Sequence, residues 1–420
     1  MNTTIVKGNI ISAPELGKLD VTEHGYLVAE DGIIQGVYET LPERYQGQRV
    51  EDYGDELVVQ SFADMHLHAP QYPMVGMGMD LPLIEWLNTY TFPTEARFKD
   101  NDFAREAYRK LAAELVANGT TRVCMFSSLH REATMILMEE LEKAGVTGYV
   151  GKVNMDRNGG VDLEETTEES VEETLRWLED CHFEHIKPIL TPRFVPSCTD
   201  ELMERLGQIA KEQNLPVQSH LSENTGEIAW VSELHPECPQ YWDAYAKYGM
   251  WNDRTVMAHC VWSDERERKA MKDAGVLVAH CASSNENLTS GYAPVRVMLN
   301  EGVRVALGSD IAGGDKISMF DVTADTIRAS KARCIMDNWK TPFLTVSEAW
   351  YLATSAGSQF FGEKPGFAPG NSLHAIVLRD DSLVSTTTLS PSQRLERVVY
   401  RRQNNAVHAV FSAGRKVYTA

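Results

Sequence analysis

Residues 298–310 read MLNEGVRVALGSD, and this stretch indicates how the chain folds. A helical pattern ends at Gly302, and a run of mostly apolar residues follows at once. Glycine just past a helix tolerates the left-handed conformation that ends it, and a buried parallel strand reads as a continuous apolar run. The same order of helix, glycine and strand recurs in three other stretches: ELVANGTTRVCMF (114–126), LEKAGVTGYVGKV (141–153) and MKDAGVLVAH (271–280). The repetition predicts a chain built from β–α units.

Eight strands of this kind can be counted, with helical periodicity between them. The expected strands are 58–66, 120–126, 147–154, 186–191, 215–220, 255–259, 276–280 and 303–309. Thr199, for example, can cap a helix whose apolar residues share one face: Leu202, Met203, Leu206, Ile209 and Ala210. Eight alternations favour a closed (β/α)8 TIM barrel over an open sheet, and we place this barrel at residues 58–364.

The two ends of the chain have a different pattern. Residues 1–57 alternate with a period of two, and a turn is expected at Asp31-Gly32. The C-terminal segment alternates likewise, with a hairpin expected around Ala413-Gly414. Neither end is long enough to form a stable domain alone. We therefore expect residues 1–57 and 365–420 to form one small β-sandwich beside the barrel.

The charge of the chain bears on its partners. The 420 residues carry a formal net charge of −20, whereas proteins that bind nucleic-acid phosphates present a basic surface. We therefore expect no nucleic acid and no anionic membrane as partner, but a small-molecule substrate. The N-terminus has no signal-peptide pattern, and no uncharged apolar run approaches the roughly 18 residues that span a bilayer, so a cytoplasmic location is expected.

The cysteines and one acidic stretch give two further predictions. The seven cysteines are widely spaced without a C-x-x-C pair, which predicts neither a disulfide framework nor a cysteine zinc site. The acidic stretch 164–173 is expected to be a solvated helix or loop face.

Histidines and one carboxylate stand where the predicted strands end. The relevant residues are His66 and His68 after the first strand, His220 after the fifth, His259 after the sixth, His280 after the seventh and Asp310 after the eighth. The active site of such a barrel lies at the carboxyl ends of its strands, and neutral imidazole with carboxylate is a donor set that holds zinc while leaving room for water. The pattern therefore predicts a metal site at this rim.

The residues alone leave several roles open. His259 could ligate the metal or hydrogen-bond a metal-bound water, Asp310 could ligate and also accept a proton, and His280 could be structural. Glu223 follows His220 by three residues and could serve as a general acid or base. The fourth strand ends in Leu-Thr-Pro-Arg at 190–193, and Lys187 lies too early in it to reach the rim and bridge a second ion, so one metal ion is expected.

At these residues the chain resembles the amidohydrolase superfamily, in its mononuclear deaminase branch, and more narrowly the guanine deaminases. The stretches that carry the resemblance are HLHAPQY (66–72), DLPLIEWLNTYTFPTEARF (80–98), TPRF (191–194), SHLSEN (219–224), MAHC (257–260) and GSDIAGG (308–314). H-x-H alone is a weak signal, whereas the second and third stretches together are highly specific.

The resemblance implies a set of roles. Zinc would be bound by His66, His68, His220 and Asp310, one ion per subunit, although the same ligands accept iron(II). His259 would orient the hydrolytic water, Glu223 would shuttle protons, and Asp310 would help to move them. The purine would be held by Gln71, Arg193 and Phe194, with Trp86 lining the same pocket. The implied reaction is the hydrolysis of guanine to xanthine and ammonia, and the resemblance also suggests a homodimer.

Three departures and three alternatives accompany this interpretation. The chain has Ser61-Phe62 in place of the usual Pro-Gly, HCASSN (280–285) in place of HCPxSN, and PGNSLHAIVL (369–378) in place of PG-x-x-A-D. The second departure leaves open another aminohydrolase substrate, such as 8-oxoguanine, a pterin or a triazine. A two-metal cyclic amidase and a scaffold without catalysis are the remaining alternatives.

Overall fold

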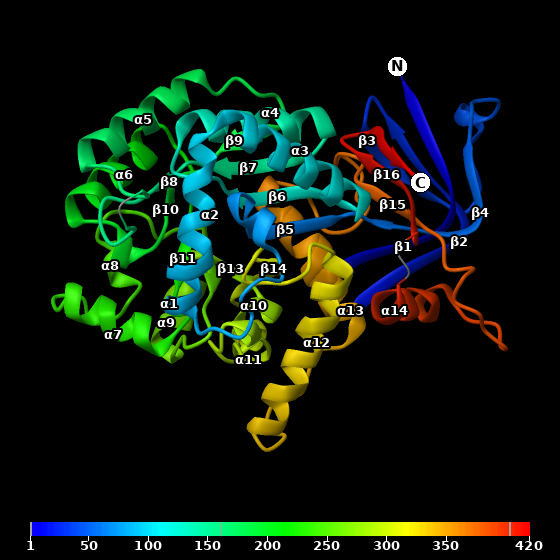
Figure 1. Cartoon of the computed structure of the whole chain (residues 1–420). Coiled ribbons are helices and arrows are strands. Elements are labelled where there is room, and N and C mark those ends of the chain that lie inside the picture. The colour runs from blue at the N-terminus through cyan, green and yellow to red at the C-terminus, as the bar shows by residue number, and fades with distance from the viewer. Residues whose placement is uncertain (1, 161, 403–404) are drawn as a thin grey trace.

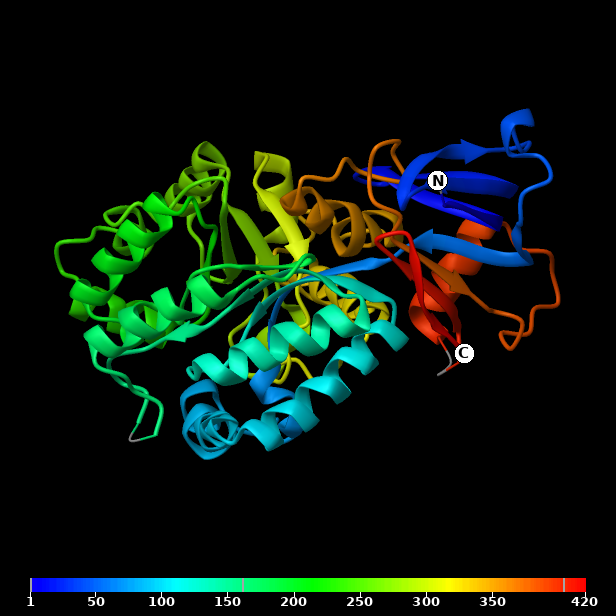
Figure 2. The same cartoon turned by 90° about the horizontal axis from the view of Figure 1, so that it is seen from above.

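The computed structural model describes residues 2–160, 162–402 and 405–420. Figure 1 shows two parts: helices alternate with strands over most of the chain, and strands from both ends of the chain gather beside them on the right. Figure 2, which views the molecule from above, shows the same separation. The chain is therefore of mixed α/β type.

Parallel strands form the larger part. They are β5 (Phe62–His68), β6 (Thr120–Phe126), β7 (Thr147–Gly151), β8 (Val153–Asn154), β9 (Ile186–Pro188), β10 (Thr191–Pro192), β11 (Val217–Leu221), β12 (Thr255–His259), β13 (Leu277–His280) and β14 (Arg304–Leu307). Hydrogen bonds join them in the orders β5-β6-β7-β9, β10-β8 and β11-β12-β13-β14. Each of these pairings is parallel.

The apolar runs locate these strands well where turns flank them. The strands predicted at 120–126 and 255–259 are confirmed at both ends. The strand predicted at 58–66 is wrong at its start, because the run crosses from one sheet to another at Ser61. Val58 pairs with strands of the terminal sheet, whereas Phe62 pairs with Thr120.

Two other expected strands are interrupted. The strand expected at 147–154 breaks at Lys152, and the one expected at 186–191 breaks after Pro188. The second break lies where the pairing changes, because Pro188 still pairs with Val150 of β7 whereas Leu190 forms a bridge with Val217 of β11. The pieces after each break, β8 and β10, pair with each other.

Backbone contacts link the three parallel sheets. The N–H of Asp310 donates to the carbonyl of His66 (2.8 Å), and the N–H of His68 donates to the carbonyl of Ile311 (3.0 Å). Leu190 forms a parallel bridge with Val217. The segment that follows β14 therefore lies against β5, and the segment between β9 and β10 lies against β11.

Helices fill the connections between strands. They are α1 (Leu83–Trp86), α2 (Phe92–Ala96), α3 (Asn101–Ala117), α4 (Arg131–Ala144), α5 (Thr167–Asp180), α6 (Asp200–Glu212), α7 (Thr225–Leu234), α8 (Asp243–Ala246), α9 (Glu265–Ala274), α10 (Ala282–Asn287), α11 (Val295–Glu301), α12 (Met319–Met336), α13 (Val346–Tyr351) and α14 (Pro391–Arg401). Single turns of 3-10 or π helix are η1 (Glu43–Tyr45), η2 (Ala69–Met74), η3 (Leu87–Thr91), η4 (Arg97–Lys99), η5 (Val195–Ser197), η6 (Leu352–Ala356) and η7 (Gln359–Phe361).

The ends of these helices follow the predicted signals. Thr199 accepts a hydrogen bond from the N–H of Leu202 (3.2 Å) and so caps α6, as predicted. Gly275 and Gly302 end α9 and α11 with φ angles of 74° and 84°, the left-handed conformation expected of them. In the acidic stretch 164–173, Glu168 and Glu169 are exposed at the start of α5.

Strands from both ends of the chain form one seven-stranded sheet. Its members are β1 (Thr3–Glu15), β2 (Lys18–Glu30), β3 (Ile33–Tyr38), β4 (Glu51–Gln60), β15 (Ala375–Leu378), β16 (Val407–Ser412) and β17 (Arg415–Thr419). Their order is β17-β16-β15-β4-β1-β2-β3. The turns predicted at Asp31-Gly32 and Ala413-Gly414 are confirmed, and both residues of each turn have positive φ angles, as a tight hairpin requires.

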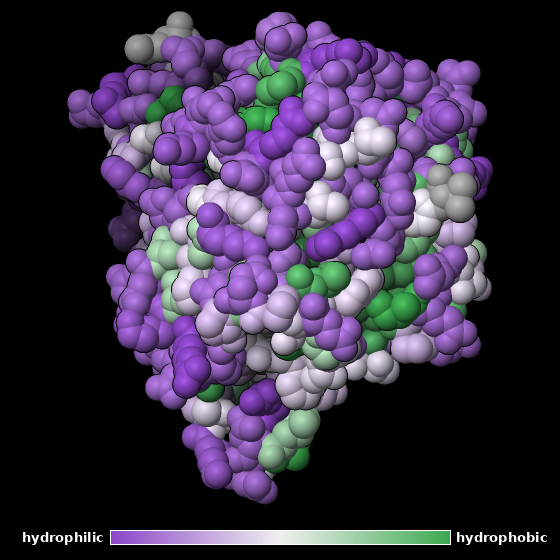
Figure 3. Space-filling view, turned by 90° about the vertical axis from the view of Figure 1, so that its left-hand side faces the viewer, coloured by the Kyte–Doolittle hydropathy of each residue, from purple (hydrophilic) through white to green (hydrophobic). Residues whose placement is uncertain are grey.

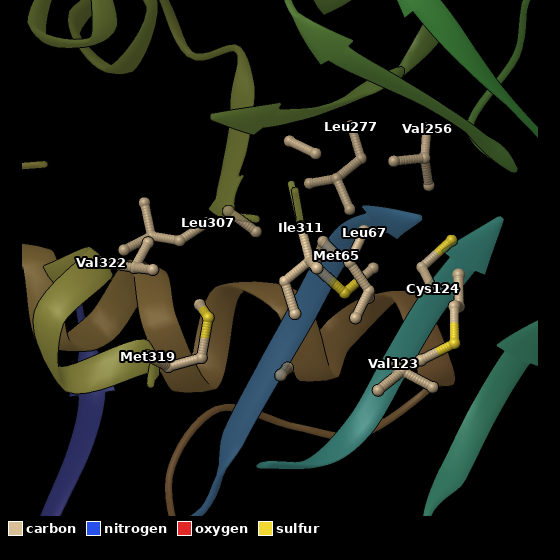
Figure 4. Close-up of a cluster of buried hydrophobic side chains, with 14 of the residues drawn as sticks. Met65, Leu67, Val123, Cys124, Val256, Leu277, Leu307, Ile311, Met319 and Val322 are labelled. Carbon is tan, nitrogen blue, oxygen red and sulfur yellow. The ribbon is translucent and has the colours of Figure 1, made fainter. Parts of the chain in front are cut away.

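Apolar side chains fill the space between strands and helices. Figure 4 shows Met65 and Leu67 of β5 close to Val123 and Cys124 of β6, with Ile311 nearby. These five side chains are fully buried. The surface seen in Figure 3 is mostly hydrophilic. In the described part of the chain, no helix has the length and apolar character needed to cross a membrane.

Candidate metal centre and substrate cavity

Four imidazoles and a carboxylate meet at the carboxyl ends of the strands. His66 and His68 come from β5, His220 from β11 and His259 from β12, and Asp310 lies three residues beyond β14. The ring of His66 lies 5.0 Å from that of His68, 4.8 Å from that of His220 and 5.4 Å from that of His259, centroid to centroid. The structure thus gathers residues separated by up to 244 positions into one cluster.

The donor atoms of this cluster approach one another closely. Oδ1 of Asp310 lies 3.2 Å from Nε2 of His66 and 3.6 Å from Nε2 of His68. Nε2 of His68 lies 3.1 Å from Nε2 of His220. The buried Nε2 of His66 has no hydrogen-bond partner among the described residues, although buried polar atoms normally have one. Because imidazole and carboxylate are donors that divalent zinc and iron accept, this set fits a divalent metal ion.

Hydrogen bonds behind the imidazoles fix two of the rings. Nδ1 of His220 lies 2.6 Å from the backbone oxygen of Arg193, which can only accept, so this nitrogen carries the proton and Nε2 is left free. Nδ1 of His259 lies 2.9 Å from Oδ1 of Asn285. Contacts of this kind orient a ligand ring and select its tautomer.

The protonation of the cluster suits a cation. Burial lowers the pKa of three imidazoles, which are therefore neutral donors near pH 7: His66, His68 and His220. Burial also acts to lower the pKa of His259, but the nearby carboxylates outweigh it and raise this pKa. Burial acts to raise the pKa of Asp310, but His66 and the other histidines outweigh it, so this pKa is lowered and the group stays a carboxylate.

Glu223 is held beside His259 by its surroundings. Its Oε1 accepts a hydrogen bond from the hydroxyl of Ser290 (2.9 Å), and its Oε2 lies 3.6 Å from Nε2 of His259. The carboxylate of Glu227 accepts the backbone N–H of Glu223 (2.9 Å) and thereby fixes the loop. Burial raises the pKa of Glu223, so this group retains a proton at a higher pH than a solvated glutamate does.

The backbone is unusual where the chain leaves three of these strands. Ser222, His259 and Asp310 have φ angles of 47°, 71° and 49°. Residues other than glycine rarely adopt positive φ angles, and such residues cluster at functional sites, where the surrounding structure holds them. The strain here accompanies the sharp turns that aim Glu223, His259 and Asp310 inward.

One cavity opens onto this cluster. It is lined by His68, Gln71, Leu83, Trp86, Leu87, Arg193, Phe194, His220, Glu223, Glu227, His259, Leu288, Asp310 and Gly313. The four side chains expected to hold a purine all belong to it: Gln71, Trp86, Arg193 and Phe194. The indole N–H of Trp86 donates to the carbonyl of Met77 (3.0 Å). The expected purine contacts thus share one cavity with three of the expected metal donors, His68, His220 and Asp310, while His66 contacts Asp310 from outside this lining.

Comparison with known proteins agrees with this geometry. The profile of the amidohydrolase family matches residues 57–417. The chain belongs to the amidohydrolase family. Among curated members, the guanine deaminase of Dictyostelium discoideum is 38% identical over 375 residues, which cover 84% of this chain and 83% of that protein. The guanine deaminase of Mus musculus is 41% identical over 330 residues, which cover 77% and 72%.

Solved structures of guanine deaminases are similar to this chain in fold and in sequence. A crystal structure of guanine deaminase from C. acetobutylicum, with guanine bound in its active site, superposes with a TM-score of 0.97. It is 40% identical in sequence, over 99% of this chain and 100% of that one. Guanine deaminase from E. coli superposes with a TM-score of 0.91 at 29% identity, over 100% of both chains.

Two residues weighed in the sequence lie apart from the centre of this amidohydrolase. His280 is buried at the end of β13 but lines a separate cavity, together with Arg333 and Asp337 of the α12 region. Burial lowers its pKa to about 4. Lys187 is exposed, and its ammonium donates to the carbonyl of Phe183, so it does not reach the rim.

Four further residues support the site and were missed in the sequence. Asn285 holds His259, Ser290 and Glu227 hold Glu223 and its loop, and Glu95 binds both Arg193 and Gln71. Glu95 lies within the stretch 80–98 and Glu227 follows the stretch 219–224, whereas Asn285 and Ser290 lie outside the stretches that carry the resemblance. No local pattern shows which distant residue each one contacts.

Replacing Asn285 by alanine should lower kcat/KM by about 10–100-fold, the usual cost of losing a group that orients a residue beside a metal. The reason is that Nδ1 of His259 would lose its acceptor. Steady-state kinetics with matched metal content provide the measurement. Asn285→Asp keeps an acceptor oxygen at this position and should retain more activity; equal losses in both variants would contradict the assigned role.

Proposed function

We propose that this amidohydrolase is a guanine deaminase, which hydrolyses guanine to xanthine and ammonia. The observation that carries the proposal is the single cavity lined by metal donors, by buried Glu223 and by Gln71, Arg193 and Phe194. The similarity to guanine deaminases over most of the chain supports the same substrate.

In this proposal, the purine is held by four side chains. Arg193 offers a planar fork of N–H donors suited to the O6 and N7 acceptors of guanine, and Phe194 offers a ring for stacking. Gln71 supplies an amide whose orientation is fixed from two sides, and Trp86 closes the apolar part of the cavity. Together they would present C2 of guanine to the metal donors.

The residues proposed to hold one zinc ion are His66, His68, His220 and Asp310, and iron(II) would fit the same donors. When bound, such an ion would lower the pKa of a coordinated water to about 7 and so supply a nucleophile near neutral pH. His259, with its Nδ1 held by Asn285, would orient the attacking water through Nε2.

Glu223 and Asp310 would move the protons. The carboxyl group of Glu223 gives a proton to N3 of guanine as the water oxygen bonds to C2, and the water gives up a proton to a carboxylate. That carboxyl group then passes its proton to the amino nitrogen and the C2–N bond breaks. Ammonia leaves as the C2 hydroxyl returns its proton to Glu223 and becomes the C2 carbonyl of xanthine. The raised pKa of Glu223, caused by burial, favours the protonated form that this first transfer needs.

We also propose that residues 58–364 close into a (β/α)8 barrel and that residues 1–57 and 365–420 form a small β-sandwich beside it. The neighbour order of the parallel strands, with the segment after β14 against β5, supports closure. Buried side chains on both faces of the seven-stranded sheet, such as Ile5 and Val6, support the second part. The homodimer and the cytoplasmic location stay predictions.

Purified protein tested on several bases would decide the substrate. We expect release of ammonia and formation of xanthine from guanine, with much lower activity on adenine, cytosine and 8-oxoguanine. Ammonia release and the ultraviolet spectra of substrate and product are the measurements. A higher kcat/KM for another heterocycle would overturn the assignment to guanine while leaving a hydrolytic deaminase.

A further inference from the structure

We propose that Glu95 is a positioning residue that gives the cavity its preference for an uncharged purine, acting through Arg193 and Gln71. This inference rests on the proposed function, because it concerns the same cavity. Glu95 is not among the described residues that line the cavity. It lies on α2 behind Arg193 and Gln71, so its effect on a ligand would pass through them.

The carboxylate of Glu95 binds both purine-contact residues at once. Oε2 accepts a hydrogen bond from Nη1 of Arg193 (2.6 Å), and Oε1 accepts one from Nη2 (3.0 Å). Oε1 also accepts a hydrogen bond from Nε2 of Gln71 (2.8 Å). These contacts join residues that are 98 and 24 positions away from Glu95 in the chain.

This arrangement fixes the groups that a purine would meet. The amide of Gln71 is held at its other end by the backbone N–H of Ala312, which donates to Oε1 (2.9 Å). An amide held in this way cannot exchange its donor and acceptor ends. Arg193 gives two of its five N–H donors to Glu95, and the others remain for different partners. The guanidinium plane is thereby set before any ligand enters.

The charge of Arg193 is compensated inside the protein. The side chains of Arg193 and Glu95 are 5% and 2% exposed. A buried ion pair is costly to break, because the remaining charge is left without a partner. Arg193 is the only positively charged side chain of the lysine or arginine type among the described residues that line the cavity. Glu95 therefore lets Arg193 offer directional donors without offering a net positive charge.

Guanine and xanthine, the substrate and product of the proposed reaction, differ in how readily they become negatively charged. Guanine is uncharged near neutral pH. Xanthine loses a ring proton more readily, because its anion is delocalised over two carbonyl groups. A guanidinium without its carboxylate would attract the xanthine anion and slow product release, whereas the Glu95–Arg193 pair does not. Glu95 thus favours the neutral substrate over the ionised product.

Two variants separate the charge of Glu95 from its shape. Glu95→Gln keeps the size of the side chain but removes the charge, and its NH2 group would face a donor of Arg193 or Gln71. Glu95→Asp keeps the charge, but its side chain is shorter by one methylene group, so the carboxylate lies farther from Arg193 and Gln71. Hypoxanthine and xanthine serve as ligands, because both have the O6 and N7 edge and neither has a 2-amino group to lose. Their Kd values would be measured by calorimetry at a pH between their two ionisations.

We expect Glu95→Gln to lower the Kd of xanthine relative to the Kd of hypoxanthine by about tenfold. Glu95→Asp should weaken both ligands while leaving the ratio close to that of the unaltered protein. With guanine as substrate, Glu95→Gln should make xanthine a stronger product inhibitor. An unchanged ratio in Glu95→Gln, or an equal shift in Glu95→Asp, would overturn the proposal. Because the binding ratio needs no turnover, a protein inactive on guanine would count against the proposed function alone.

The chain contains a matched control for a buried glutamate–arginine pair. Glu363 binds Arg122, whose side chain is 3% exposed, and neither residue lines the cavity. Glu363→Gln removes the same charge from the same kind of pair. It should lower the melting temperature as Glu95→Gln does, and it should leave the Kd ratio unchanged. A shifted ratio in Glu363→Gln would mean that general destabilisation explains the effect at Glu95.

Discussion

Glu223→Gln should lower kcat by about 10²–10⁴-fold, the range in which a positioned general acid or base contributes. Glutamine fills the same space and can accept the hydrogen bond from Ser290, but it cannot take up and release a proton. KM for guanine and the metal content should change little, since Glu223 is not among the proposed metal ligands. Stopped-time assays of xanthine formation, with metal content measured on the same samples, provide the test.

Glu267 provides the control for this substitution. It is also a buried glutamate near the same loop, where its carboxylate accepts hydrogen bonds from Ser222 (3.1 Å) and Ser263 (2.5 Å). It does not belong to the described cavity lining. Glu267→Gln should keep most of the activity. Full activity in Glu223→Gln, or an equal loss in both variants, would remove Glu223 from the proton path.

The main features of the fold follow from local sequence, and the exceptions have a physical reason. The strands at 120–126 and 255–259 are short apolar runs with turns on both sides, so their bounds can be read directly. At 58–66 the apolar run continues through Ser61, because Val58 is buried in one sheet and Phe62 in another. An apolar pattern reports burial, but it does not report which sheet covers a residue.

Some residues of the candidate site can likewise be predicted from local sequence, and others cannot. His66, His68 and Asp310 could be proposed from the sequence because the carboxyl ends of parallel strands share one rim. Asn285 and Glu95 could not, because each acts through a contact with a residue 24 or more positions away. Glu95 lies within the stretch 80–98 and Asn285 within HCASSN (280–285), but neither pattern shows which distant side chain the residue contacts. Only the packed structure shows that Asn285 contacts His259 and that Glu95 contacts Arg193 and Gln71.

Removal of the metal should abolish the activity. Prolonged dialysis against a chelator should lower kcat by about a thousandfold or more, because a bound ion contributes several kcal/mol to the stabilisation of charge in the transition state. Addition of zinc or iron(II) to the stripped protein should restore activity, and the ion that restores more of it identifies the better fit. Stripped protein that keeps its full rate, with metal content verified as negligible, would contradict the proposed centre.

His68→Asn tests the same centre from the side of the protein, and His280→Asn is its matched control. Both histidines are buried at the carboxyl end of a strand, so both substitutions remove an imidazole from a similar environment. Nε2 of His68 lies within 3.6 Å of both His220 and Asp310, whereas His280 lines a different cavity. We therefore expect His68→Asn to lose both the ion and the activity, and His280→Asn to retain both even if its melting temperature falls. Metal analysis separates the two cases, because a general loss of packing would affect both variants alike, whereas a ligand role affects only the residue whose nitrogen faces the carboxylate.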